Sequence, residues 1–273
     1  MLFFEIIRRS LNYYPFSRGR QFVYKKFIKN RSFRNALLKV NNPFKTKAGY
    51  FIFLNHGDYT SNWIKLFGQH NEPSTYDFLN GHLKVGDRFV DIGANVGVYS
   101  LFVAHKFSGG VNVLSFEPNP KIHKHLEDSI KINHFEGFMK AFQMGVSDEM
   151  GVVKFSENLS DSGSSRFEEN GGSNCIQLPV VNFDDWYLNN EKKEKSPIGC
   201  IKIDVEGFEV KVLRGIKNTL SKFKPALVIE CLESNLVTAG YNSESLKNLL
   251  FEYGYTIQTE VEHNLYCIHR DRQ

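Results

Sequence analysis

One short glycine-containing segment constrains the fold of this chain more than any other feature. Residues 90–97 are Val-Asp-Ile-Gly-Ala-Asn-Val-Gly, with the strand-like segment 88–92 leading into them and the apolar segment 98–106 following. A glycine turn between a strand and a helix is typical of nucleotide sites in parallel α/β sheets. The segment therefore predicts a strand–turn–helix unit with a ligand site at the turn.

The segments that follow alternate between strand-like and helix-like patterns. Such alternation implies a mostly parallel, doubly wound α/β sheet covered by helices on both faces. The final two strands, 255–259 and 265–269, are expected to form an antiparallel pair. The other expected strands are 111–116, 138–146, 151–156, 176–181, 198–203 and 226–231, and the expected helices are 76–83, 120–133, 183–188, 209–220 and 243–253.

The first 47 residues differ from the rest of the chain in charge. They contain twelve Lys or Arg and a single acid, Glu5, which gives a net charge of +11. Because the whole chain carries +4, the remainder carries −7. Apolar residues interleave with these cations, which predicts helices. The sequence therefore divides into a basic helical N-terminal extension, residues 1–47, and one α/β domain, residues 48–273.

The residues of the glycine turn favour one class of nucleotide ligand over another. A dinucleotide site would require glycine at the third and sixth positions of the turn, where this chain has Asn95 and Val98. Side chains at these two positions crowd the place that the pyrophosphate of a dinucleotide would occupy. A nucleoside ligand with an amino-acid tail in place of the pyrophosphate tolerates these side chains. Gly93 allows the turn its unusual backbone angles, and Asp91 can accept from an ammonium group. The turn therefore favours S-adenosylmethionine over a nicotinamide dinucleotide.

Two further polar positions follow predicted strands. Glu117 comes directly after the strand 111–116, about 20 residues beyond the glycines, where a carboxylate can accept both ribose hydroxyls. Ser147 and Asp148 follow the segment 138–146 and could lie beside an adenine amino group. A capped turn explains Ser147 and Asp148 equally well, since both residue types favour turns.

Three acids cluster after the predicted buried strand 198–203. Asp204, Glu206 and Glu209 lie just beyond its carboxyl end, where open α/β sheets bind ligands. Crowded carboxylates are expected to raise one another's pKa, as a general base or a metal ligand requires. Glu209 could instead complement the dipole of the helix that it begins. Asp204 and Glu206 are therefore the candidate catalytic residues.

These motifs, in this order and spacing, resemble the FkbM family of methyltransferases over residues 76–233. The most specific part is Asp-Val-Glu-Gly-Phe-Glu at 204–209, followed by Val212, Leu213 and Gly215. The resemblance implies a Rossmann-like class I methyltransferase fold and places Asp204 and Glu206 at the methyl-transfer centre. Phe208 departs from the histidine that is frequent in the family. The implied cofactor-binding residues are Asp91, Gly93, Asn95, Gly97, Glu117, Ser147 and Asp148.

The resemblance implies O-methylation of a sugar, glycan or other hydroxylated metabolite, with S-adenosylmethionine as the methyl donor. Whether a divalent cation is a second cofactor is left open by the sequence. A nicotinamide-dependent oxidoreductase and a non-catalytic binding protein are the alternatives. Acceptor specificity is expected from 49–75 and 157–175. No apolar stretch reaches about 18 residues, and the cysteines are scattered, so we expect a cytoplasmic protein. The basic extension could contact anionic membrane, whereas no motif indicates nucleic-acid binding.

Overall fold

A seven-stranded sheet forms the centre of the protein in the computed structural model, which describes residues 11, 17–40, 42–55, 57–156, 166–167, 175–190 and 196–272. The strand order is β12-β13-β11-β10-β3-β4-β5. All neighbours pair in parallel except β13, which is antiparallel to both β11 and β12. The strands are β3 (Arg88–Ile92), β4 (Asn112–Phe116), β5 (Met139–Phe142), β10 (Ile198–Ile203), β11 (Ala226–Glu230), β12 (Tyr255–Val261) and β13 (Asn264–His269).

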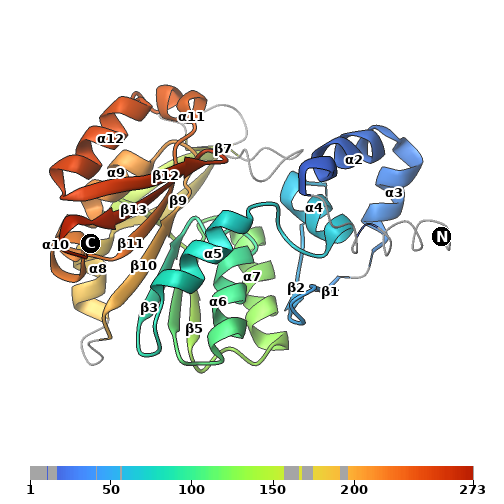
Figure 1. Ribbon diagram of the computed structural model, residues 1–273, viewed down its shortest axis with the longest axis horizontal. Coiled ribbons are helices and arrows are strands. Elements are labelled where there is room, and N and C mark those ends of the chain that lie inside the picture. The colour runs from blue at the N-terminus through green and yellow to red at the C-terminus, as the bar shows by residue number, and fades with distance from the viewer. Residues whose placement is uncertain are drawn as a thin grey trace.

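Helices cover both faces of this sheet (Figure 1). One face carries α5 (Pro73–His82), α6 (Val98–Phe107) and α7 (Pro120–Ile132), and the other carries α8 (Phe183–Asn190), α9 (Glu209–Gly215), α10 (Lys217–Phe223) and α12 (Ser243–Glu252). The short helices α11 (Glu233–Thr238) and η2 (Arg270–Arg272) complete this part of the chain. The predicted doubly wound, mostly parallel α/β sheet with an antiparallel C-terminal strand is confirmed.

The alternation of side chains along the central strands divides the core into two layers. In β3, Phe89 packs with the cluster formed by α5, α6 and α7, whereas Val90 and Ile92 pack with the cluster on the opposite face. All five residues of β3 and all six of β10 are buried. Strands buried on both faces are mostly apolar, and β3 and β10 are apolar apart from Arg88, Asp91 and Lys202, which explains why they were recognisable as strands.

The prediction of one strand over 138–146 is wrong. The chain leaves the central sheet after β5, where the Met144 amide donates to Phe142 O over 2.9 Å, and continues as β6 (Gly145–Ser147) in a second sheet. That sheet has the order β6-β9-β7-β8 and contains β7 (Gly151–Ser156), β8 (Arg166–Phe167) and β9 (Cys175–Asn182). Phe142, Met144 and Val146 pack with the same core cluster, so the alternation of apolar residues continues across the turn and gives no sign of the break.

Two helix boundaries also differ from the predictions. The expected helix 209–220 is divided at Ile216, whose buried side chain ends α9 before α10 begins. The helix expected at 76–83 begins earlier as α5, with Pro73 in its first turn and Glu72 at the N-cap. Proline is favoured in a first turn because it lacks the amide hydrogen that would be unpaired there.

The basic N-terminal segment is helical where the structure describes it. It contains α2 (Ser17–Lys29) and α3 (Arg31–Leu38), which pack on α4 (Tyr59–Phe67) around Tyr24, Leu37 and Trp63. A small hairpin, β1 (Phe44–Lys45) with β2 (Phe51–Ile52), joins α3 to α4. Within the described residues, no helix is long and apolar enough to cross a bilayer. Most of the region 157–175, which was expected to contribute to acceptor specificity, lies outside the described residues.

Candidate active site

A cavity of about 430 Å³ opens beside the carboxyl ends of β3, β10 and β11. Its size is suited to a nucleoside-sized ligand. Six acids and one lysine line it among the described residues, so the cavity favours ligands that carry positive charge. These lining residues are Asp58, Glu72, Glu117, Asp204, Glu206, Glu230 and Lys202. Gly93, Asn95, Tyr99, His70, Gly145 and Val146 are also in its wall.

The glycine turn forms the floor between β3 and β10. Gly93 has a φ of +77°, and a Cβ added to it would lie 1.8 Å from the backbone oxygen of Asp204. Asn95 also has a positive φ, of 50°, and its side-chain oxygen accepts from the Val96 amide over 2.8 Å. Only glycine fits at 93, because the turns after β3 and β10 touch there.

Glu117 lines the cavity as predicted and is fixed by backbone donors. Its two carboxylate oxygens accept from the amides of Asn95, over 2.9 Å, and Asn119, over 2.8 Å. Burial raises the pKa of Glu117 to about 7, against the opposing effect of these hydrogen bonds. Each oxygen retains a second lone pair, so the side chain can also accept from ligand hydroxyls.

Asp91 lies beneath the floor and is not among the residues that line the cavity. It is fully buried, accepts from Ser100 Oγ over 2.6 Å, and lies 3.6 Å from Lys202 Nζ. Burial alone would lower the pKa of Lys202, but the carboxylates of Asp204 and Asp91 outweigh it and raise that pKa. Asp91 therefore holds a charged lysine at the cavity, and direct contact of Asp91 with a ligand stays a prediction.

Three other predicted cofactor residues do not reach the cavity. Gly97 begins α6 with a φ of +87°, and a Cβ there would lie 2.3 Å from Leu126. Ser147 donates to Asp148 over 3.0 Å at the end of β6, outside the cavity wall. Their neighbours Gly145 and Val146 line the wall instead, so the adenine role assigned to Ser147 and Asp148 stays a prediction.

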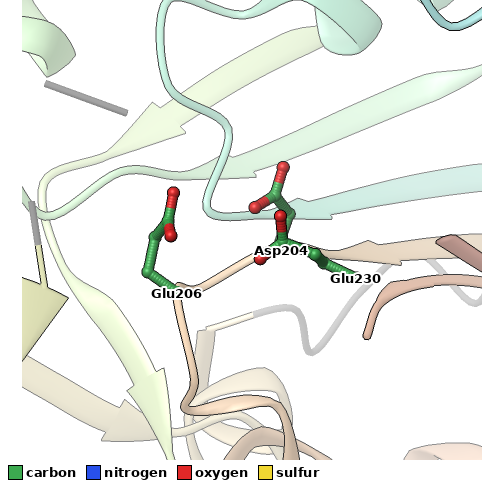
Figure 2. A group of neighbouring side chains, drawn as sticks. All are labelled: Asp204, Glu206 and Glu230. Carbon is green, nitrogen blue, oxygen red and sulfur yellow. The ribbon is translucent and has the colours of Figure 1, made fainter. Parts of the chain in front are cut away.

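Asp204, Glu206 and Glu230 converge at one side of the cavity (Figure 2). One carboxylate oxygen from each lies within 4.8 Å of the other two, a separation at which a single cation could be bound. Burial, followed by the charges of Asp204 and Glu206, raises the pKa of Glu230 well above its usual range. Crowding of carboxylates at this strand end was expected, and Glu230 is the member that the sequence prediction missed.

Glu206 is held in a strained conformation by its surroundings. Its backbone φ is +54°, a value that residues other than glycine rarely adopt. Its side-chain Oε2 accepts from Asn235 Nδ2 over 2.6 Å. Glu209 ties the same turn together because its Oε1 accepts from the amides of Val205 and Gly207. Strain of this kind concentrates at functional sites, and here it directs the Glu206 side chain toward the cavity.

The sequence prediction missed two groups of residues that line this cavity. Glu230 ends β11, which pairs in parallel with β10 so that Ile229 is opposite Ile203. This register puts Glu230 beside Asp204, and an acid after a strand adjacent to an acidic strand end was a usable signal. His70 and Glu72 come from the connection between α4 and α5, where no pattern identified them.

Comparisons with known proteins give three further findings. The hexuronic acid methyltransferase AglP of Haloferax volcanii is 24% identical over 163 residues, 59% of this chain and 60% of that protein. The 31-O-demethyl-FK506 methyltransferase FkbM of Streptomyces tacrolimicus is 28% identical over 163 residues, 50% of this chain and 62% of that protein. A crystal structure of methyltransferase FkbM from Methylobacillus flagellatus aligns with 89% of this chain and 59% of its own length, at 17% identity and a TM-score of 0.46.

The chain thus spans about three fifths of the length of each of these proteins. A family model gives the decisive comparison: residues 91–257 match the methyltransferase FkbM domain. This match covers more than half of the chain and runs from the glycine turn through the acidic ends of β10 and β11 into β12. The resemblance seen in the sequence is confirmed. The chain belongs to the FkbM family of S-adenosylmethionine-dependent methyltransferases.

Proposed function

We propose that this protein transfers a methyl group from S-adenosylmethionine to a hydroxyl oxygen of a sugar or another hydroxylated metabolite. One observation carries the proposal. A single cavity combines the glycine turn and Glu117 with the three carboxylates Asp204, Glu206 and Glu230. The bound cofactor supplies an activated methyl carbon. The carboxylates supply what a hydroxyl acceptor needs, which is a group to take its proton.

The residues of the cavity divide between the two ligands in this proposal. Gly93 and Asn95 border the amino-acid end of the cofactor, and Glu117 accepts from the ribose. Asp204 or Glu206 orients the acceptor hydroxyl and takes up its proton. Holding the reacting oxygen in line with the methyl carbon is the main contribution that the protein can make to the rate.

The names of the relatives guide the choice of acceptor. One relative is named for hexuronic acid and another for 31-O-demethyl-FK506, so sugars and hydroxylated metabolites are the classes to test first. Mass spectrometry of glycans and small metabolites from cells with and without the gene should find products that differ by one methylene unit. No such difference, together with no turnover of candidate acceptors by purified protein, would favour a non-catalytic binding protein.

The role of Glu206 can be tested once an acceptor is available. Glu206→Gln should lower turnover by about 100-fold or more, because the amide cannot accept the proton, while S-adenosylhomocysteine affinity changes less than about twofold. Glu252→Gln, at an exposed position on α12, is the matched control. Wild-type turnover in Glu206→Gln would remove this assignment.

A divalent cation offers a second way to acidify the hydroxyl. Asp204, Glu206 and Glu230 present oxygen ligands of the kind that Mg²⁺ and Mn²⁺ prefer, and a cation would displace the proton that Glu230 otherwise retains. Calorimetric titration of Mg²⁺ should give binding heat that is lost in Glu230→Gln. No heat with the unmodified protein would leave direct proton transfer to a carboxylate as the mechanism.

The nicotinamide alternative is disfavoured by Asn95 and by family membership. It makes a distinct prediction, an increase in NADH fluorescence on titration with the protein. We expect no change in NADH fluorescence and clear binding of S-adenosylhomocysteine.

We also propose that the protein is cytoplasmic and contacts anionic membrane through residues 1–47. The support is the charge of this segment and the exposure on α2 of Phe22, 72% exposed, beside Lys25 and Lys26. Clustered cations beside an exposed aromatic ring favour an anionic lipid surface. Vesicles containing phosphatidylserine should sediment with the full chain. Unchanged sedimentation after deletion of residues 1–47 would contradict the proposal.

A further inference from the structure

A chain of three hydrogen-bonded side chains lies in the cavity wall next to the glycine turn. The Tyr99 hydroxyl donates to Glu72 Oε2 over 2.5 Å, and His70 Nδ1 lies 3.1 Å from the same hydroxyl. Asn264 Nδ2 also donates to Glu72, over 3.3 Å. All three members of the chain line the cavity.

This chain assigns the tautomer of His70. The hydroxyl has one hydrogen, and Glu72 receives it, so His70 Nδ1 must carry a hydrogen and donate it to the Tyr99 oxygen. Burial lowers the pKa of His70, which keeps the ring neutral near neutral pH. His70 Nε2 is then an unprotonated acceptor.

His70 Nε2 has no hydrogen-bond partner within the described part of the chain, and this nitrogen retains some accessible surface. The residue is only 9% exposed and lines the cavity, so its remaining accessible surface faces the cavity. A nine-tenths-buried acceptor directed into a cavity is placed to accept from a donor on a bound ligand, since leaving it unpaired costs stability.

Lys202 supplies a positive charge at the same end of the cavity as His70 and Glu72. Its Nζ lies 3.4 Å from Gly93 O and 5.5 Å from the centre of the Tyr99 ring. An acceptor pair, His70 and Glu72, beside a buried ammonium group matches an α-amino-acid group, whose ammonium needs acceptors and whose carboxylate needs a cation. Glu117 is joined to the other side of the glycine turn through the Asn95 amide.

We propose that His70 Nε2 and Lys202 bind the amino-acid end of S-adenosylmethionine, with His70 accepting from the ammonium group and Lys202 pairing with the carboxylate. Tyr99 and Glu72 are positioning residues that fix the His70 tautomer. This inference rests on the proposed function. It adds His70 and Glu72, which lie before residue 91, where the family match begins.

Two ligands that differ only at this end test the proposal. S-adenosylhomocysteine carries the amino-acid group, and 5′-methylthioadenosine lacks it. Calorimetry on the full chain should show that His70→Phe weakens S-adenosylhomocysteine binding by about 10- to 100-fold, the effect of one hydrogen bond to a charged group. Binding of 5′-methylthioadenosine should change less than about twofold. His105→Phe, at an exposed position on α6, is the matched control and should bind both ligands normally.

Tyr99→Phe provides a second test that keeps His70 in place. It should weaken S-adenosylhomocysteine binding by about 3- to 10-fold, again without affecting 5′-methylthioadenosine, because the tautomer is no longer fixed. Equal loss of both ligands, or no loss of S-adenosylhomocysteine, would overturn the proposal. If the unmodified protein binds neither ligand, the proposed function itself fails.

Discussion

The pKa of Glu230 makes the stability of this protein depend on pH in a defined direction. Burial beside Asp204 and Glu206 raises that pKa above the ordinary value of 4.5. Above pH 4.5, the unfolded chain has released a proton that the native protein still binds, so the free energy of unfolding falls as pH rises. Stability is therefore lost toward alkaline pH, opposite to the behaviour of a salt-bridged carboxylate.

Glu230→Gln should remove this pH dependence, because glutamine resembles the protonated acid. The stability of the variant relative to the native chain should increase by about 1 to 3 kcal/mol between pH 5 and pH 8. Urea unfolding at both values, in the presence of EDTA, measures this difference. Glu252→Gln is the control, and a Glu230→Gln effect that does not vary with pH would contradict the prediction.

Gly93 and Gly57 provide a matched pair for the contact between the two loops. Both have positive φ, but a Cβ at Gly57 would meet nothing within 4 Å, whereas one at Gly93 would overlap the Asp204 backbone oxygen. Gly57→Ala should cost about 1 kcal/mol from strain alone. Gly93→Ala should cost about 3 kcal/mol or more and abolish S-adenosylhomocysteine binding. Equal losses of stability would show that the contact matters little.

At the scale of helices and strands, α4 joins the basic N-terminal helices to the cavity. Trp63 and Phe67 are fully buried against Tyr24 and Leu37, and Asp58 both caps α4 and lines the cavity. Removing the large Trp63 side chain leaves a void that these neighbours cannot fill. Trp63→Ala should therefore lower the free energy of unfolding by about 3 to 5 kcal/mol. In thermal or urea unfolding, Phe22→Ala, at an exposed position, should change stability by less than about 0.5 kcal/mol.

The elements also show which structural features a single sequence can predict. β3 and β10 were predictable because burial on both faces favours apolar residues, which make up most of each strand. The break between β5 and β6 was not, since local hydrophobicity is the same on both sides of the turn. Asp204 and Glu206 were found from their place after a strand. Glu230 lies beside them because of the register between β10 and β11, and His70 reaches the cavity through the path of the connection between α4 and α5. Both are properties of tertiary structure.

Considered as a whole, the molecule should be stabilised by its cofactor product. The cavity wall combines residues of β3, β10 and β11 and of the turn after β4 with residues from the connection before α5, so a ligand there would contact segments distant in sequence. At about 100 times its dissociation constant, S-adenosylhomocysteine should add about 2.7 kcal/mol to the free energy of unfolding. That corresponds to a rise of about 5 to 10 °C in Tm. Gly93→Ala should show no rise, and an equal shift in both proteins would indicate binding elsewhere.

The wall that carries Asp58, His70 and Glu72 precedes the segment by which the family is recognised, 91–257. A fragment cut to those limits would begin inside β3, with Arg88, Phe89 and Val90 of that strand missing. It would retain the acids of the far side but would leave the ligand exposed to water on the near side. The segment that the family model matches therefore lacks one wall of the cavity, and the residues before position 91 help to determine the shape of the ligand that the cavity can hold.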